Sequence, residues 1–371
     1  MPLQPNGGKL LMPVETEADV CALFEKALAL SQTSGFLTRD RYRADIEDHF
    51  YYIGAICPQH FRPLQQEVVN LSGEQLTFFH FSFSTWLYLL HDAPDSCAEQ
   101  LLQRLLRADQ DCSPSILEAM LAAIGTPTAL AAMAEYAERT HKQNVFRDLG
   151  FWLPGKGKRA EPRFTRHRSA VRFQPIDTTL PLQELVKRPH PVGLPVSFIA
   201  GEPASSMITW HYLTLDLARI DGLPPTSFSR IHLVSPPQHS GWTLFCTISQ
   251  QNLYTQAHLH VSEDQDLEML EQLQEQAIEH QNDGRGELLL LPYDDQLVYR
   301  NGHTQLTKGV HGDVGGPPLG LDENPCCPIC KKLMFHVCTV ATTLREYGDG
   351  FRSLFFCEGC MQIASQAMGW N

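Results

Sequence analysis

The sequence predicts a multi-domain protein that joins an all-α part to an α+β part. Three observations lead to this prediction. Apolar residues recur with a helical period over about the first 150 residues. From about residue 176 the pattern changes to short β-branched or aromatic runs bounded by Pro, Gly or Ser. Six of the 11 cysteines lie between residues 326 and 360, so we expect the β-rich part to end in a cysteine-rich module.

The composition limits the class of protein. The chain has 371 residues and is 43% hydrophobic, which excludes wholesale disorder and predicts two or three domains. Its 42 acidic residues exceed the 29 basic ones, so nucleic acid is a disfavoured partner. The first twelve residues lack the pattern of a secretory signal, the apolar stretches are short for a membrane span, and the cysteine count is odd. We therefore predict a cytoplasmic protein with no membrane partner.

Residues 1–153 are expected to form the helical domain. Thr16 can cap a first helix with Asp19 at its third position, and the apolar residues from Val20 to Leu28 then share one helix face. Further helices are predicted over 40–52, 58–71 and 75–90. The last of these is rich in aromatic residues, and we expect it to be buried rather than to form a binding surface.

Residues 96–141 show a more regular pattern. Ser113-Pro114 starts one helix, and Gly125-Thr126-Pro127 ends it and starts another. The helix, turn and helix with Ala and Leu along the seam resemble a HEAT-like repeat. Such units stack and expose a long edge that commonly binds protein. An ordinary helical bundle is the alternative.

Residues 154–175 are basic, with seven Lys or Arg against one acid. Pro and Gly interrupt the stretch, so we predict an exposed linker between domains. Arg163, Arg166 and Arg168 are candidate contacts for an acidic protein partner. The alternative is that these arginines pair with acidic residues of the chain's own domains.

Residues 176–371 are expected to form the α+β domain. Strands are predicted over 195–200, 208–215, 230–234, 242–249, 253–261, 287–291 and 296–299. One helix interrupts them, beginning at a capping box of Ser262 and Gln265. Its second face is acidic and is either a solvated surface or a docking face for a basic ligand. The candidate contacts on it are Glu263, Asp264, Asp266, Glu268, Glu271 and Glu275.

Two Cys-x-x-Cys turns carry the clearest chemistry. Cys327 and Cys330 form the first, Cys357 and Cys360 the second, and 26 residues separate them. Each turn places two thiolates on one side of a loop, and two such turns complete a tetrahedral shell that suits Zn²⁺. We predict a zinc ribbon over 315–371 with strands over 333–340 and 353–356. Four cysteine ligands leave no open position, so the zinc would be structural.

Other residues near these turns are rivals for the same role. Cys326, Cys338 and His336 could compete as ligands, and the alternatives are a spare neighbour in the turn and two strand positions. A redox Cys-x-x-Cys is the rival interpretation of each turn, although no thioredoxin-like context surrounds them.

The same segment carries a family resemblance. A Gly315-Gly316-Pro317-Pro318 turn, the first Cys-x-x-Cys, Met334-Phe335, Phe355-Phe356 and the second Cys-x-x-Cys follow in order. This arrangement resembles the C-terminal module of programmed-cell-death-protein-2-like proteins and an uncharacterised bacterial family. Leu319-Gly320 and Lys331 depart from the family pattern. The resemblance implies a β-rich binding module without established catalysis.

No motif of a known enzyme class is evident. The chain has neither a Gly-x-x-x-x-Gly-Lys-Ser/Thr loop nor a Gly-x-Ser-x-Gly elbow. His258 and His260 alternate on a predicted strand, and with His232 and His239 they could bind a second metal or act in acid–base chemistry. Solvent-facing strand histidines explain the same pattern. We therefore predict a non-enzymatic protein.

These features together favour a protein that binds another protein. The leading hypothesis is a bacterial immunity protein that neutralises a secreted toxin of a type VI or contact-dependent system by direct binding, because an acidic surface suits a basic toxin. One alternative is an adaptor or chaperone in the assembly of ribosome or secretion components. Another is a hydrolase that uses the β-domain histidines.

Overall fold

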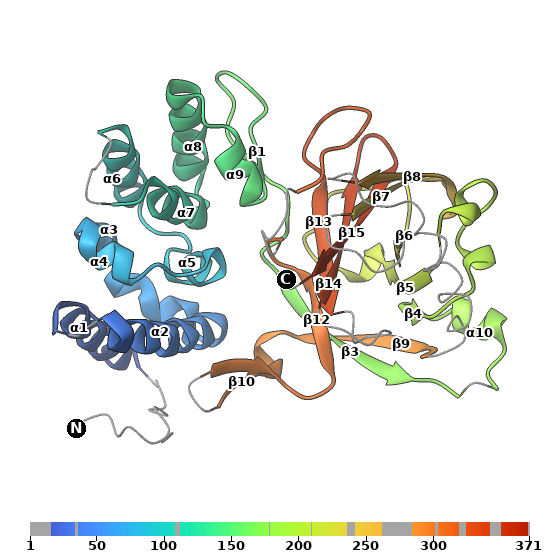
Figure 1. Ribbon diagram of the computed structural model, residues 1–371, viewed down its shortest axis with the longest axis horizontal. Coiled ribbons are helices and arrows are strands. Elements are labelled where there is room, and N and C mark those ends of the chain that lie inside the picture. Colours follow the sequence, from blue (N-terminus) through green and yellow to red (C-terminus); the bar gives the residue numbers. More distant parts are fainter. Residues whose placement is uncertain are drawn as a thin grey trace. The chain divides into compact units, whose positions relative to one another are not determined.

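The computed structural model describes residues 16–33, 36–107, 112–177, 179–208, 210–235, 242–261, 284–300, 303–318, 324–341 and 350–369. The chain divides into two compact units. The first unit comprises Met1–Glu161 and Asp294–Thr307, and the second comprises Pro162–Tyr293 and Lys308–Asn371. The boundary therefore falls inside the stretch expected as a linker, and each unit is described by itself (Figure 1).

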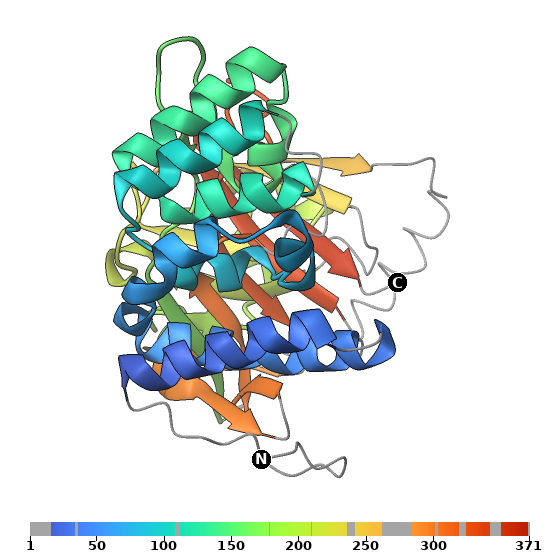
Figure 2. The ribbon, with the colours of Figure 1, turned by 90° about the vertical axis from the view of Figure 1, so that its left-hand side faces the viewer.

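The first unit is helical, as predicted. Its helices follow one another in layers, with α2 against α5, α5 against α7, and α6 against α8 (Figure 2). The helices are α1 (Glu17–Thr33), α2 (Phe36–Ile56), the 3-10 helix η1 (Pro58–Leu64), α3 (Gln65–Val69), α4 (Gly73–Phe78), α5 (Phe83–Leu89), α6 (Asp95–Leu106), α7 (Pro114–Ile124), α8 (Pro127–Thr140) and α9 (Asn144–Asp148). A hairpin of β10 (Leu297–Arg300) and β11 (His303–Leu306) packs on α2. A HEAT-like stacking of these helices stays a prediction.

Aromatic side chains fill the core of this unit. Phe79 stacks on Phe24 with ring centroids 5.6 Å apart, and Phe81 meets Phe50 edge to face at 5.7 Å. The aromatic residues expected to be buried are therefore in the core. The single helix expected over 75–90 is instead two helices, because Ser82 caps a new one by accepting a hydrogen bond from the Thr85 N–H. The break turns Phe79 and Phe81 inward.

The second unit is built on one antiparallel sheet of eleven strands. Their order across the sheet is β6-β5-β4-β9-β3-β12-β13-β14-β15-β7-β8. The strands are β3 (Arg168–Pro175), β4 (Pro191–Val192), β5 (Trp210–Asp216), β6 (Arg230–Ser235), β7 (Trp242–Ile248), β8 (Tyr254–Val261), β9 (Gly286–Pro292), β12 (Val310–Gly315), β13 (Phe335–Ala341), β14 (Gly350–Cys357) and β15 (Gln362–Gly369). The short helix α10 (Leu182–Val186) lies outside the sheet.

Most of the predicted strands are present, with one exception. The run expected as a strand over 195–200 contains a 3-10 helix, Val196–Phe198. Pro195 precedes the helix and the Ile199 N–H closes it on the Val196 carbonyl, so the chain turns where a strand would extend. The short strands β1 (Phe151–Trp152) and β2 (Glu161–Pro162) complete the list of strands among the described residues.

The sheet curls into a half-barrel, and its two edge strands approach each other. The backbone N–H of His232 on β6 donates to the hydroxyl of Tyr254 at the start of β8, and this hydroxyl donates in turn to the His232 carbonyl. Apolar side chains of β5 and β6 pack with those of β13, β14 and β15 in one core. The Tyr254 side chain of β8 therefore holds the backbone of β6, a strand with which β8 does not pair.

Two buried histidines continue this polar connection. The Leu194 N–H donates to His211 Nδ1 at 2.9 Å, so the proton of His211 lies on Nε2, which donates to Thr214 Oγ1 at 2.9 Å. The Thr214 hydroxyl then donates to His232 Nδ1 at 2.8 Å, and His232 Nε2 donates to the Asn252 carbonyl at 2.8 Å. The donor at one end and the acceptor at the other fix both rings as neutral Nε2–H tautomers.

The stability of this unit is expected to fall as the pH drops from 6.5 towards 4. Burial lowers the pKa of His232 from 6.5 to about 4, and burial lowers that of His190 to about 4 as well. Between these values the unfolded chain binds protons that the folded chain does not, so acid favours unfolding by up to roughly 3 kcal/mol per histidine. Urea unfolding at pH 7 and pH 5 measures the difference, which should shrink in a His232→Gln variant. Equal unfolding free energies at both pH values would contradict this prediction.

The basic stretch is not an exposed linker over residues 168–175. These residues form β3, which pairs with β9 and β12 near the middle of the sheet. Arg168 Nε donates to Asp313 Oδ2 at 2.8 Å, and its guanidinium lies 4.2 Å from the centre of the Tyr293 ring. Arg163 is buried and Arg166 is exposed. The alternative interpretation, in which the arginines pair with the chain's own acids, therefore describes Arg168.

Two further expectations from the sequence concern an acidic helix and the lack of a membrane span. The predicted acidic helix, with Glu263, Asp264, Asp266, Glu268, Glu271 and Glu275, lies outside the described residues. Among the residues that are described, no helix combines the length and the apolar character that crossing a membrane requires.

Candidate metal centre

The first Cys-x-x-Cys turn lies immediately before β13. The Lys331 N–H donates to the Cys327 carbonyl, and the Cys327 N–H donates to the Lys332 carbonyl, each at 2.9 Å. Lys331 has a left-handed backbone with φ of 62°, a conformation that favours glycine. The turn closes although the sequence carries lysine there.

The second Cys-x-x-Cys turn connects β14 to β15. Cys357 is the last residue of β14 and pairs with Gln362, the first residue of β15. Met361, directly after Cys360, has φ of 54° and repeats the left-handed step of the first turn. Because Phe335 at the start of β13 pairs with Phe356 on β14, the sheet places both turns at the same end of neighbouring strands.

The four thiols converge. The Sγ atoms of Cys327, Cys330, Cys357 and Cys360 all lie within 4.8 Å of one another, and those of Cys330 and Cys357 are 3.6 Å apart. A tetrahedral ion with bonds of about 2.3 Å requires sulfur atoms about 3.8 Å apart. All eleven cysteines lie in the described part of the chain, and none forms a disulfide. The cluster could therefore hold a metal ion, and it is the one group of this kind that the described residues contain.

Burial and the neighbouring thiols shift the pKa values of three of these cysteines, and not all in the same direction. Burial and the neighbouring thiols raise the pKa of Cys357 well above its usual range, and they raise that of Cys360 to about 11. Burial opposes ionisation of Cys330 too, but hydrogen bonds from the Lys332 backbone and the other thiols hold its pKa below the ordinary value. A divalent cation removes this mutual penalty by stabilising all four thiolates at once.

Apolar side chains pack beneath the cluster. Cys327 and Cys357 are buried together with Met334, Phe355 and Ala364, and Phe245 packs against them. Met334 and Phe355 belong to the motif that carries the family resemblance. Such a shell limits solvent access to the sulfur atoms and orients them from the protein side.

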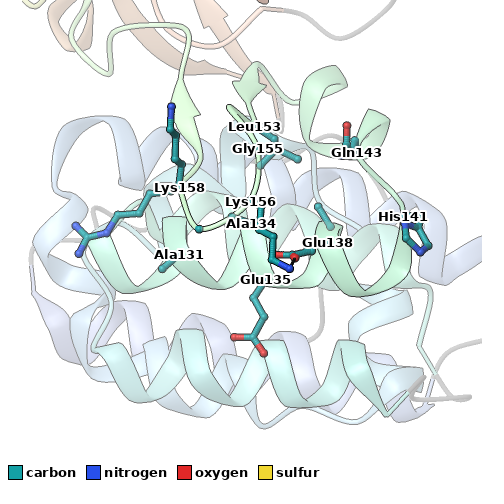
Figure 3. Close-up of a pocket in the computed structure, with 13 residues that line it drawn as sticks. Ala131, Ala134, Glu135, Glu138, His141, Gln143, Leu153, Gly155, Lys156 and Lys158 are labelled. Atoms are coloured by element: carbon teal, nitrogen blue, oxygen red, sulfur yellow. Dashed lines mark ion pairs between the residues drawn. The ribbon is translucent and has the colours of Figure 1, made fainter.

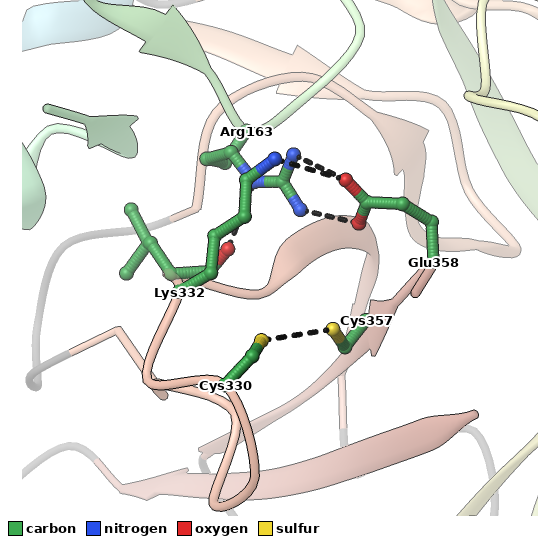
Figure 4. A network of polar contacts seen from close by, with 6 residues as sticks. Arg163, Cys330, Lys332, Cys357 and Glu358 are labelled. Atoms are coloured by element: carbon green, nitrogen blue, oxygen red, sulfur yellow. Dashed lines mark hydrogen bonds and ion pairs between the residues drawn. The ribbon is translucent and has the colours of Figure 1, made fainter. Parts of the chain in front are cut away.

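Arg163 connects the flanks of the two turns (Figure 4). Its Nη1 and Nη2 atoms donate to Glu358 Oε1 and Oε2 at 3.0 and 2.6 Å, and Glu358 lies inside the second turn. Its Nε donates to the Leu333 carbonyl at 2.8 Å, directly after the first turn. Lys332 Nζ reaches Glu358 Oε1 at 3.1 Å from the same side. We call Arg163, Lys332 and Glu358 the inter-turn triad.

The Glu358 carboxylate of this triad is held in its charged form. Partial burial alone would raise the pKa of Glu358, but the hydrogen bonds and charge of Arg163, with the help of Lys332, lower it to about 2. Arg163 is only 5% exposed, so its charge depends on Glu358 for compensation. The sequence analysis gave Arg163 as a candidate partner contact, with pairing to the chain's own acids as the alternative, and it did not single out Glu358. The available signal was a carboxylate placed between two cysteines of the candidate metal site, which calls for a nearby cation.

The rival ligands are engaged elsewhere. Cys338 lies in the main core, where burial raises the pKa of its thiol. His336 Nδ1 donates to the Gly316 carbonyl at 3.0 Å and its Nε2 bonds Thr339 Oγ1 at 2.9 Å. Cys326 forms a backbone bridge with Leu333, and its thiol is not a member of the four-cysteine group.

The histidines proposed for a second site do not come together as one. His258 and His260 are exposed on β8, an edge strand, whereas His232 is buried in the hydrogen-bonded chain with Thr214. His239 lies outside the described residues. Among those that are described, these histidines belong to no group of three potential metal ligands.

The helical unit contains a separate open cavity of about 470 Å³ between α8 and the 153–159 loop (Figure 3). Small side chains such as Ala131 and Ala134 line it, and Lys156 Nζ lies 3.4 Å from Glu138 Oε1 at its side. Both residues of this pair are largely exposed, so the contact is screened by solvent. The cavity shows no convergent set of catalytic groups among its lining residues.

Comparison with known proteins does not add a relative. A scan against protein-family models finds no matching family, and searches of curated proteins and of solved structures return no significant match. The likeness to the programmed-cell-death-protein-2-like module therefore rests on the motif residues themselves.

Proposed function

We propose that the chain is a non-enzymatic protein-binding protein. Its second unit, called the β unit from here on, is held together in this proposal by a structural Zn²⁺ on Cys327, Cys330, Cys357 and Cys360. The observation that carries this proposal is the convergence of four sulfur donors within 4.8 Å. An all-thiolate set favours Zn²⁺ over harder cations, and four protein ligands leave no position for a substrate or an activated water.

The first turn also presents an apolar side chain to solvent. Ile329, between Cys327 and Cys330, is 63% exposed. The described residues include two other large apolar side chains that count as exposed, Ile56 at 40% and Leu289 at 37%. An isoleucine held outward by a metal-bound turn supports a contact with a protein partner, because buried apolar anchors supply much of the affinity of interfaces.

The partner we propose is a basic protein toxin, which the chain neutralises by direct binding as an immunity protein. The formal net charge of −13 supports this choice, because complementary charge accelerates association and disfavours acidic partners. Type VI and contact-dependent systems are the settings in which such a pair would act.

A protection experiment tests this function. Cells expressing the full chain are challenged with the product of a toxin-like gene, if one lies next to its own gene, and binding of the two purified proteins is measured by calorimetry. We expect survival and a saturable complex, with weaker binding for Ile329→Glu at unchanged zinc content. Leu289→Glu, on β9 of the same unit, is the matched control. The absence of both protection and binding would contradict the immunity function. A ribosomal or secretion partner would favour the adaptor alternative.

A further inference from the structure

We propose that Arg163 is a positioning residue for the metal site, which holds the two Cys-x-x-Cys turns at the separation that the ion requires. This inference rests on the proposed Zn²⁺ site. It assigns a role in metal affinity to a side chain that is not itself a ligand and that lies 164 positions before the first ligand, Cys327.

The contacts of Arg163 reach three elements at once. Both Nη atoms of the guanidinium donate hydrogen bonds to Glu358 in the second turn, and Nε donates to the Leu333 carbonyl after the first turn. The Arg163 carbonyl accepts from the His336 N–H on β13 at 2.7 Å, so the backbone of the residue is fixed as well. A shift of either turn away from the other would break at least one of these bonds.

The environment makes this bridge rigid. The Arg163 side chain is 5% exposed and lies 5.5 Å from the centre of the Phe335 ring, where β13 begins. A planar guanidinium presents its donors in a fixed geometry. A bidentate pair with a carboxylate therefore defines orientation as well as distance. Lysine at this position would keep the charge but lose the bidentate geometry.

Positioning by Arg163 should appear in metal affinity, because residues that hold ligands in place raise affinity by roughly 10–100-fold. Coupling of this kind is reciprocal, so the bound ion also stabilises the contacts of Arg163. In the wild-type chain the cost of ordering the two turns is met on folding, whereas in a variant without the bridge this cost reduces the free energy of metal binding.

Arg168 provides a matched comparison within the same chain. It comes from the same basic stretch and pairs with a carboxylate, Asp313, at 14% and 13% side-chain exposure for the two partners. Its contacts with Asp313 on β12 and with Tyr293 lie outside both turns. Loss of Arg168 should therefore destabilise the sheet without loosening the metal site.

The test measures the Zn²⁺ affinity of the full chain by competition with a chromophoric chelator. We expect Arg163→Met to bind Zn²⁺ roughly 10–100-fold more weakly than the wild type. Arg163→Lys should recover part of the loss, and Arg168→Met should stay within about threefold of the wild type. Replacing Zn²⁺ by Co²⁺ adds a spectroscopic readout, since a distorted thiolate shell shifts the visible absorption bands.

If Arg163→Met does not fold, Glu358→Gln takes its place, because it keeps the shape of the acceptor and removes its charge. Equal affinities and equal Co²⁺ spectra in the wild type and in the Arg163 or Glu358 variant would overturn the positioning role. A wild-type chain that binds no metal would instead refute the zinc site itself, so the two failures are distinguishable.

Discussion

Replacing Cys357 by Ser is expected to remove the metal ion and to destabilise the β unit by more than about 3 kcal/mol. Cys357 is the last residue of β14 and is 2% exposed. Its Sγ atom lies 3.6 Å from the Sγ atom of Cys330. A serine hydroxyl at this position is a poor ligand for a soft site, and three remaining thiolates bind the ion incompletely. Because binding energy of a structural ion is also folding energy, metal loss and unfolding should occur together.

Cys246→Ser is the matched control for this variant. Cys246 is a buried cysteine of the same unit, on β7, but its side chain belongs to the main core rather than to the metal cluster. Its replacement should lower the unfolding free energy by about 1–3 kcal/mol through burial of a hydroxyl, with the metal content unchanged. Metal content by mass spectrometry and urea unfolding separate the two variants. A Cys357→Ser chain with wild-type metal content would contradict the assignment.

Replacing Gly315 by Ala is expected to cost at least about 3 kcal/mol and to disrupt the pairing of β12 with β3. Gly315 has φ of 85°, and a Cβ there would lie 1.9 Å from the carbonyl oxygen of His167. The clash involves backbone on a paired strand, since Gly315 is the register partner of Arg168. The neighbouring Gly316 donates to the Thr165 carbonyl and accepts from His336, so the Gly-Gly turn ties β12 to the segment that carries Arg163.

Gly309→Ala isolates the conformational part of this effect. Gly309 has the same φ of 85°, but a Cβ there would meet nothing within 4 Å. We expect a loss of about 1 kcal/mol for this control. Thermal unfolding of both variants gives the comparison. Similar melting temperatures would contradict the prediction, because they would mean that the clash with the His167 carbonyl adds little to the loss of stability.

Local signals predicted two helix starts and the cysteine cluster. The Pro114 and Pro127 helix starts are correct because caps and periodicity act within a few residues. The cysteine site follows the same logic, since each turn fixes two ligands locally and the intervening strands align them. In both cases the information lies in short stretches of the chain.

Three of the failures have a long-range origin. β3 was taken as part of a linker because its arginines read as exposed, yet Arg168 finds Asp313 on a strand 145 residues later. β15 was not predicted, since Ala364, Ser365 and Ala367 have weak strand preferences and are buried only by neighbouring strands. The role of Arg163 likewise depends on Glu358, 195 residues away. Pairings of this length leave no periodic trace in the sequence.

The metal content of the purified full chain tests the central claim most directly. Elemental analysis by mass spectrometry, after dialysis against metal-free buffer, should give about one Zn²⁺ per wild-type chain and none in a chain with Cys327 and Cys357 both replaced by Ser. A wild-type chain without stoichiometric metal, or equal Zn²⁺ in the doubly substituted chain, would contradict the account of this β unit as a fold held together by its four converging thiolates.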